Sequence, residues 1–272
     1  MTVVVTGLYV YPVKSCGGIA LDVAQLDARG IRFDRQWMFV DKDGTFLTQR
    51  DFPKLALVRT AFNGDNLVLS APHVRDLCVP LAQREDADVL PVVVWRDMCL
   101  AVDEGGLASE WVSQFLDCPV RLVRMADDFV RPVDPKYANT PAQTGFSDGF
   151  PLLLISEASL DDLNARLSDR GKIPLPMNRF RPNLVISGCD AYAEDTWKQV
   201  TIGDTVFDIA KASARCAITA VDQATGTIPQ HDEPLATFAI YRRGARGVLF
   251  GQNVIHRANG RIQIGDVVVV NS

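Results

Sequence analysis

Residues 197–216 read WKQVTIGDTVFDIAKASARC, in which a hairpin pattern is followed by a cysteine. Strand-like segments lie on both sides of Ile202-Gly203-Asp204, a glycine turn that can reverse the chain between antiparallel strands. Ile264-Gly265-Asp266 repeats this turn near the C-terminus. Repeated short strands with glycine turns predict a closed or nearly closed β barrel in this part of the chain.

Length and composition indicate a globular protein without a strong charge bias. The chain has 272 residues, 47% of them hydrophobic, so a sizeable core can form and two domains suit the length better than one. Its 28 basic and 33 acidic residues give a net charge of -5. Such a chain has no global basic field for nucleic acid or an anionic membrane, so we expect neither as a partner. Any anion site must be local.

The N-terminal residues and the cysteines predict a cytoplasmic protein. Met1-Thr2-Val3 leads directly into strand-like sequence, and no apolar run has the length of a signal peptide or a membrane span. The six cysteines are scattered without a CxxC pair, as expected of reduced thiols. The three histidines lie far apart in the sequence, which argues against a zinc site.

Apolar periodicity predicts strands interrupted by a few helices. In the first part of the chain, Leu107, Trp111 and Phe115 recur at helical spacing, which predicts an amphipathic helix over residues 106–116. Pro119 then ends this helix.

We place the domain boundary after this helix, between residues 1–120 and residues 121–272. In the second part, Ser156 is a suitable N-cap for a second helix, and Pro234 can occupy the first position of a short third one. The predicted fold class is therefore mainly β with a few helices (α+β).

Cys216 is the first candidate for chemistry. It follows Arg215 at the end of a β-rich segment, and nearby positive charge favours the thiolate, the form that binds metals and attacks electrophiles. The alternative is a buried cysteine that packs as a small hydrophobe. This stretch alone leaves both interpretations open.

Basic groups occur at strand ends in both halves of the chain. Lys14 and Ser15 lie in a proline- and glycine-bearing turn that is either a small anion cradle or an ordinary exposed turn. Arg35 and Arg181 each open an apolar strand, and Arg215 precedes the cysteine. One thiolate with several anion-binding groups is what a phosphorylated, sulfur-rich metal cofactor would require. The pattern does not name the metal.

A long polar loop spans about residues 127–148 and ends in GFSDG, residues 145–149. Loops of this length are often functional. The segment matches the GxSxG pattern of serine hydrolases, but a nucleophile elbow needs a strand before it and a helix after it. Here a polar loop precedes the motif and a strand-like segment follows, which argues against a hydrolase.

Several short motifs, in order along nearly the whole chain, resemble the MOSC family, in the branch of the mitochondrial amidoxime-reducing component and its bacterial relatives. They are PVKSC (12–16), DRQW (34–37), FRPNLVISG (180–188), AEDTW (193–197), RC (215–216) and FGQN (250–253). The resemblance implies an N-terminal β-rich domain up to about residue 120, followed by a MOSC β barrel.

The resemblance also implies the molybdenum cofactor (Mo-molybdopterin), with Cys216 as the protein ligand of the metal. Because the implied residues come from both domains, the cofactor should lie between them. The residues that the resemblance places around the pterin and its phosphate are Lys14, Ser15, Arg35, Asp148, Gly149, Phe150, Arg181, Ala214, Arg215 and Tyr241. Ala214 stands where the mitochondrial relatives have serine, so one polar contact to the cofactor would be lost.

The implied activity is reduction of a small N-hydroxylated compound, such as an amidoxime or an N-hydroxylated base analogue, to the amine or amidine. The chain ends at Ser272 without the cluster-binding cysteines of a ferredoxin domain. Electrons would therefore come from a separate protein of the ferredoxin, flavodoxin or cytochrome b5 type. At the family level, the resemblance also implies pyridoxal phosphate binding and a role in detoxification.

Two alternatives remain at this point. The protein could bind the molybdenum cofactor as a carrier, or carry sulfur for it, without reductase turnover, as MOSC domains fused to cofactor sulfurases do. The absence of an electron-transfer domain keeps this alternative open, and the absence of an aminotransferase-like domain argues against a complete sulfurase. A β protein with a degenerate site is disfavoured by the presence of the cysteine together with the basic groups.

Overall fold

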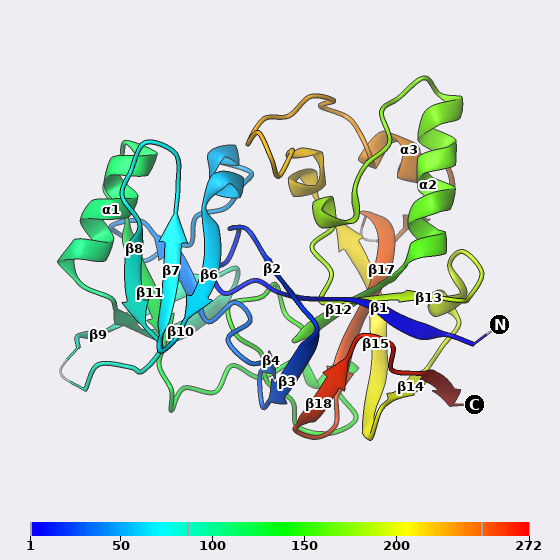
Figure 1. Cartoon of the computed structure of the whole chain (residues 1–272), viewed down its shortest axis with the longest axis horizontal. Helices are drawn as coiled ribbons and strands as arrows, with labels where there is room; N and C mark the ends of the chain where they lie inside the picture. The colour runs from blue at the N-terminus through cyan, green and yellow to red at the C-terminus, as the bar shows by residue number, and fades with distance from the viewer. Residues whose placement is uncertain (1, 86, 246, 272) are drawn as a thin grey trace.

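The protein is mainly β, and the computed structural model describes residues 2–85, 87–245 and 247–271. Figure 1 shows two bodies side by side, one carrying α1 and the other carrying α2 and α3. Across the described residues, no helix combines the length and the apolar character needed to cross a membrane.

The larger body contains a long sheet with the strand order β19-β14-β15-β17-β12-β13-β1-β2, and β16 pairs with β17 beside it. Its core consists of inward-facing aliphatic residues, among them Val10, Leu154 and Val254. The strands of this sheet are β1 (Val4–Val10), β2 (Ile19–Leu21), β12 (Leu152–Ser156), β13 (Leu184–Ser187), β14 (Gln199–Ile202), β15 (Thr205–Arg215), β16 (Arg243–Gly244), β17 (Gly247–His256) and β19 (Val268–Asn271).

The two ends of this sheet approach each other without a continuous strand pair. An isolated bridge joins Val4 to Val267. Val5 N–H donates to Asp266 O at 2.9 Å, and Val268 N–H donates to Val3 O at 2.8 Å. The strand ladder is therefore open, and these backbone bonds link the start of β1 and the residue before it to the start of β19 and the residues before it.

The glycine turn at residues 202–204 joins β14 to β15 as predicted, with Ile202 opposite Thr205. The second turn, at residues 264–266, does not form a hairpin. It connects β18 (Gly260–Gln263), which pairs with β3 (Val23–Asp27), to β19, which pairs with β14. The turn signal marks a change of chain direction, whereas the partner of each strand depends on contacts distant in sequence.

The smaller body contains two short antiparallel sheets. A third small sheet, in the order β18-β3-β4, packs into the core of the larger body. One sheet has the order β5-β11-β10-β9, and another has the order β6-β7-β8. These strands are β4 (Gly30–Ile31), β5 (Trp37–Val40), β6 (Arg59–Asn63), β7 (Asn66–Ser70), β8 (Leu77–Pro80), β9 (Val89–Val94), β10 (Asp97–Asp103) and β11 (Arg121–Met125).

The predicted helix over residues 106–116 is α1 (Gly106–Leu116), but its buried face differs from the predicted one. Leu107 is 80% exposed, whereas Trp111, Val112 and Leu116 pack into the smaller body's core. The buried stripe is therefore centred on positions 108, 111, 112 and 116, the i, i+3, i+4 spacing of a helix packed on one side.

The other helices lie on the larger body. Ser156 caps α2 (Glu157–Asp169) by accepting a hydrogen bond from Ser159 N–H, as the sequence predicts. Pro234 lies just before α3 (Leu235–Tyr241) rather than at its first position. Single turns of 3-10 helix are η1 (Pro53–Leu57), η2 (Pro135–Tyr137), η3 (Met177–Arg179), η4 (Ala193–Asp195) and η5 (Ala217–Ala220).

Strand pairing crosses residue 120 in both directions. From the N-terminal part, β1 pairs with β13 in the larger body. From the C-terminal part, β11 pairs with β5 in the smaller body. The domain limits 1–120 and 121–272 stay a prediction, and the two parts of the chain are interlocked rather than joined end to end.

Candidate cofactor site

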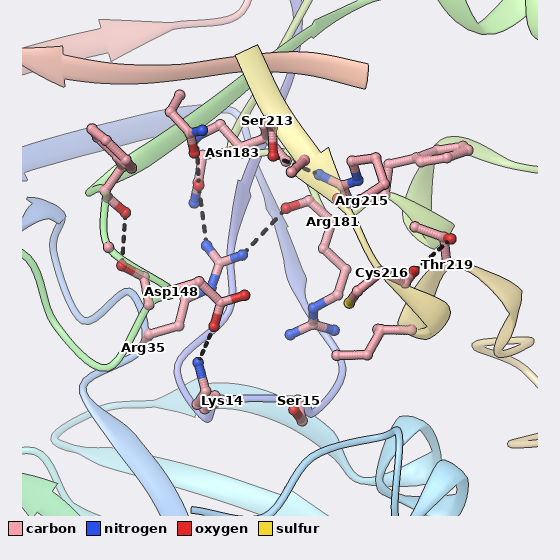
Figure 2. A pocket seen from close by; sticks show the side chains of 18 of the residues that line it. Lys14, Ser15, Arg35, Asp148, Arg181, Asn183, Ser213, Arg215, Cys216 and Thr219 are labelled. Carbon is pink, nitrogen blue, oxygen red and sulfur yellow. Dashed lines mark hydrogen bonds and ion pairs between the residues drawn. The ribbon is translucent and has the colours of Figure 1, made fainter. Parts of the chain in front are cut away.

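A cavity of about 260 Å³ collects side chains from distant parts of the chain. Ten of the residues expected at the site line it: Lys14, Ser15, Arg35, Asp148, Gly149, Phe150, Arg181, Ala214, Arg215 and Cys216. Figure 2 shows the labelled members of this set converging on one space, together with Asn183, Ser213 and Thr219.

Backbone hydrogen bonds bring the first two segments together. Lys14 and Ser15 lie in the turn after β1, where Lys14 N–H donates to Trp37 O at 2.8 Å. Arg35 lies in the turn before β5, and its N–H donates to Tyr11 O at 2.8 Å. Both side chains are at least 90% buried and line the cavity, so this is not an ordinary exposed turn, and the anion cradle stays a prediction.

Left-handed backbone is concentrated among these residues. The φ angles of Ser15, Arg35 and Arg181 are 66°, 46° and 55°. Non-glycine residues rarely adopt this region, and each instance costs on the order of 1–3 kcal/mol. The surrounding structure holds three cavity residues in this conformation, as is common where side chains must be aimed at a ligand.

Tyr11, which the sequence did not single out, separates two arginines. The guanidinium carbons of Arg35 and Arg181 lie 4.4 and 4.3 Å from the centre of its ring. The ring is buried, and its hydroxyl donates to Pro182 O at 3.1 Å. Burial, with repulsion from Arg35, lowers the pKa of Arg181 to about 10. These protein surroundings stabilise the positive charge poorly, and an anion bound beside Arg181 would stabilise it.

Lys14 fixes the loop that precedes β12. Its ammonium donates to Phe146 O at 2.8 Å and to Asp148 Oδ1 at 2.6 Å. Burial lowers the pKa of Lys14, and the Asp148 carboxylate opposes this effect. The ion pair therefore holds the Asp148-Gly149-Phe150 segment at the edge of the cavity.

Cys216 is the first residue after β15 and the residue before η5. Its thiol is partly exposed rather than fully buried, which argues against the interpretation as a packing residue. Arg50 Nη1 lies 4.0 Å from its sulfur. The Arg50 guanidinium carbon also lies over the Trp95 ring, 4.5 Å from its centre.

Arg50 and Trp95 are functional candidates that the sequence did not reveal. Arg50 follows Gln49 in an ordinary polar turn, and Trp95 lies between β9 and β10 with a φ of 59°. Trp95 also donates from Nε1 to Asp148 Oδ1 at 3.0 Å. The signal that marks Trp95 is its left-handed backbone, which is unusual for a bulky residue. That signal is visible only once the backbone conformation is known.

One expected site residue lies elsewhere. Tyr241 is at the end of α3, where its hydroxyl lies 2.8 Å from the Tyr192 hydroxyl. It lines a separate cavity with Trp197 and Arg242. Although Tyr241 follows the Cys216 segment closely in the sequence, α3 packs against α2 and β17 and places the tyrosine outside the cavity.

Ser147 of the GxSxG motif is not arranged as a nucleophile. Its hydroxyl donates to Phe150 O at 2.7 Å and lies 2.5 Å from Thr144 Oγ1. No histidine contacts it within the described part of the chain. The motif instead shapes the loop, because Gly145 lies directly against the backbone of Arg35.

Comparisons with known proteins identify the family. The family described as "MOSC N-terminal beta barrel domain" matches residues 2–119, and "MOSC domain" matches residues 141–269. "Mitochondrial amidoxime-reducing component 1" of Homo sapiens is 36% identical over 281 residues, covering 97% of this chain and 82% of the human protein. The chain belongs to the MOSC family.

Two further relatives are an amidoxime-reducing component and a molybdenum cofactor sulfurase. "Mitochondrial amidoxime reducing component 2" of Homo sapiens is 34% identical over 246 residues, covering 88% of this chain and 72% of that protein. "Molybdenum cofactor sulfurase" of Oryza sativa subsp. japonica is 33% identical over 258 residues, covering 90% of this chain and 31% of that protein. In the present MOSC protein, Lys14 to Arg35 lie in the N-terminal match and Asp148 to Cys216 in the MOSC domain, so both regions build the cavity.

Proposed function

We propose that this protein is a molybdenum-cofactor-dependent reductase that converts N-hydroxylated compounds, such as amidoximes and N-hydroxylated base analogues, to amines or amidines. The observation that carries the proposal is a partly exposed thiol, Cys216, in a cavity lined by cationic side chains. The names of the amidoxime-reducing relatives, which match nearly the whole chain, support this reaction.

The residues present fit the cofactor. Nη2 of Arg181 and Nε of Arg215 are buried and have no hydrogen-bond partner within residues 2–85, 87–245 and 247–271. Buried donors without acceptors are costly, and a phosphate would satisfy both. The described residues contain no cluster of three or more His, Cys, Asp or Glu side chains. A metal here would therefore take Cys216 from the protein and its other sulfur ligands from the pterin.

Each group of the chain has a separate task in this proposal. When bound, the molybdenum cofactor supplies the two-electron chemistry that removes oxygen from nitrogen. Cys216 would hold the metal, and Arg181 and Arg215 would hold the phosphate. Arg50 donates toward the Cys216 sulfur and fixes its direction, while Trp95 keeps Arg50 in place. Lys14 donates to Asp148 Oδ1 and Phe146 O and so holds the loop at the edge of the cavity.

Substrate and partner follow from this arrangement. The cavity is small, which suits a small-molecule substrate bound beside the cofactor. Each turnover needs two electrons, and the described chain carries no cluster of cysteines that could hold an iron–sulfur centre. We therefore include in the proposal a separate one-electron donor protein. The scattered free cysteines support a cytoplasmic location as a further part of the proposal.

The test is anaerobic turnover of benzamidoxime and an N-hydroxylated purine by cofactor-loaded protein with a chemical reductant. We expect product from wild type and none from Cys216→Ala, with Cys216→Ser folded but inactive because a hydroxyl is a harder ligand than a thiolate. Cys78→Ser, which changes an exposed cysteine on β8, is the matched control and should keep full activity.

The outcome also separates the second candidate function. The match to the rice molybdenum cofactor sulfurase favours a protein that carries the cofactor or its sulfur. Full molybdenum occupancy without turnover of either compound would support that function. A fully active Cys216→Ser protein would instead refute the role of the thiolate.

A further inference from the structure

Lys211 differs from every other cation of the cavity. Lys14 and Arg35 have carboxylate partners at 2.6 Å, Arg181 and Arg215 donate to backbone carbonyls, and Arg50 donates toward the Cys216 sulfur. Within the described residues, the Lys211 ammonium has neither an ion pair nor a hydrogen bond. It contacts only two aromatic rings, those of Tyr137 at 4.5 Å and Phe150 at 5.1 Å.

We propose that Lys211 and Phe150 form a substrate subsite that binds an anionic group, such as a phosphate, carried by an aromatic N-hydroxylated compound. This inference rests on the proposed reductase function and names its substrate class: N-hydroxylated nucleotides in preference to neutral amidoximes or nucleosides. An ammonium has three hydrogen-bond donors and no acceptor, so the oxygens of a phosphate would supply the acceptors that the surrounding residues do not.

The fold places this subsite and Cys216 at separate positions along the lining of one cavity. Both residues lie on the β15 segment, five positions apart, which corresponds to about 16 Å of extended strand, slightly less where bulges interrupt the pairing with β17. A ligand that reaches both positions must therefore be elongated. A nucleotide extends farther from a reducible group near Cys216 toward Lys211 than a free base or benzamidoxime does.

The walls beside Lys211 suit a planar ring. Phe150 lines the cavity and packs edge-on against Tyr137 with ring centres 5.9 Å apart. Asn253 of β17 is the register partner of Lys211 and also lines the cavity, where its amide can hydrogen-bond to a base or a sugar. An aromatic wall next to a free cation is the combination that recognises a base with an attached phosphate.

The cofactor itself contains a ring and a phosphate, so it is an alternative ligand for Lys211. Its phosphate has better ligands elsewhere in the cavity, where Arg181 and Arg215 have buried N–H groups without acceptors. Two arginines together present two unpaired N–H groups to the phosphate, and each would form a charge-assisted hydrogen bond. Lys211 is then the cation left for the substrate.

The test compares N-hydroxycytidine 5′-monophosphate with N-hydroxycytidine as substrates of the cofactor-loaded protein. Lys211→Gln should raise KM for the phosphorylated compound about tenfold or more, because a charged hydrogen bond is lost, with kcat and the KM of the nucleoside unchanged. Lys211→Arg should restore most of the difference. Lys198→Gln, which removes an exposed lysine outside the cavity, is the control for net charge.

Binding of the product gives a readout that does not depend on turnover. By calorimetry, cytidine 5′-monophosphate should bind the wild-type protein more tightly than cytidine, and Lys211→Gln should abolish this preference. No turnover of either substrate by wild type would refute the reductase function, while the calorimetry still tests Lys211. Equal effects of Lys211→Gln on both ligands, or loss of molybdenum and pterin from this variant, would overturn the subsite.

Discussion

Tyr11 shows how single residues prepare the cavity for an anion. Two guanidinium groups would normally repel each other, yet those of Arg35 and Arg181 are both held within 4.4 Å of one tyrosine ring centre. Each contact of this kind contributes on the order of 0.5–2 kcal/mol, depending on how far it is desolvated. The ring therefore keeps positive charge concentrated before any ligand arrives, at a cost that ligand binding would offset.

Replacing this ring should weaken anion binding. We expect Tyr11→Leu to lower the affinity of cofactor-free protein for inorganic phosphate, measured by calorimetry, because both arginines lose their support. The free energy of unfolding should fall by about 2–4 kcal/mol, since a buried ring is lost. Tyr11→Phe is the matched control: it keeps the ring, loses only the hydrogen bond to Pro182 O, and should cost about 1 kcal/mol. Unchanged phosphate affinity in the leucine variant would contradict this role of the ring.

The sequence predicted the residues that carry charge but not those that aim them. Lys14, Arg35 and Arg215 were identifiable because a basic residue at a strand end is visible in the chain itself. Tyr11 and Arg50 were not, because their roles depend on partners far along the chain: Arg181 for the first and Cys216 for the second. A tyrosine in a strand is otherwise a core residue by default.

Among the elements, the loop before β12 is held in place by contacts too close for any side chain. A Cβ atom on Gly145 would lie 2.7 Å from Arg35 O and 2.9 Å from Asp34 O. This approach allows Phe146 N–H to donate to Arg35 O at 2.7 Å. Lys14 then binds the same loop through Phe146 O, so the loop is clamped from two sides.

A methyl group at this position should release the loop. We expect Gly145→Ala to lower molybdenum occupancy after purification and to increase proteolytic cleavage within residues 126–151, because backbone oxygens cannot move aside as a flexible side chain does. The cost in unfolding free energy should be about 1–3 kcal/mol. Gly106→Ala is the control, since a Cβ there has no neighbour within 4 Å, and it should change neither readout. Normal occupancy in Gly145→Ala would show that the close approach is dispensable.

Elements defined by local pattern were predicted well, and their partners were not. The helix over residues 106–116 and the cap at Ser156 depend on nearby residues, and both are present. The turn at residues 264–266 was expected to join the two strands of a hairpin. It does not, because β18 pairs with β3, more than 200 residues earlier. Tyr241 was misplaced for the same reason: the path of α3 depends on its packing against α2 and β17.

At the scale of the whole molecule, the cavity exists only because the two parts of the chain interlock. Its lining runs from Lys14 to Asn253. Reciprocal amide hydrogen bonds between Gln49 and Gln223, at 3.0 and 2.9 Å, join the two sides, and Arg181 Nη1 donates to Cys16 O. A ligand that contacts both sides therefore stabilises the closed arrangement by mass action, so cofactor loading should raise the unfolding temperature.

One such interlock makes stability depend on pH. His256 of β17 is buried, and its Nε2 lies 2.6 Å from Asp27 O of β3. A carbonyl only accepts, so Nε2 donates, and burial lowers the pKa of this imidazole below its usual 6.5. In the unfolded chain the group titrates normally. Below pH 6.5 the unfolded state therefore binds more protons at this imidazole than the folded state does. The free energy of unfolding falls as the pH drops from 6.5 toward the lowered pKa.

We expect the free energy of unfolding, measured by urea titration, to be insensitive to this group above about pH 7.5 and to fall below pH 6.5. The slope from one such group cannot exceed about 1.4 kcal/mol per pH unit. His256→Gln can still donate to Asp27 O but does not titrate, so it should remove this part of the slope. His73→Gln, at an exposed position, should retain the wild-type slope. If His256→Gln and wild type lose stability in parallel between pH 7 and pH 5, the carboxylates alone account for the acid sensitivity, and His256 does not act as the pH-dependent link between β17 and β3.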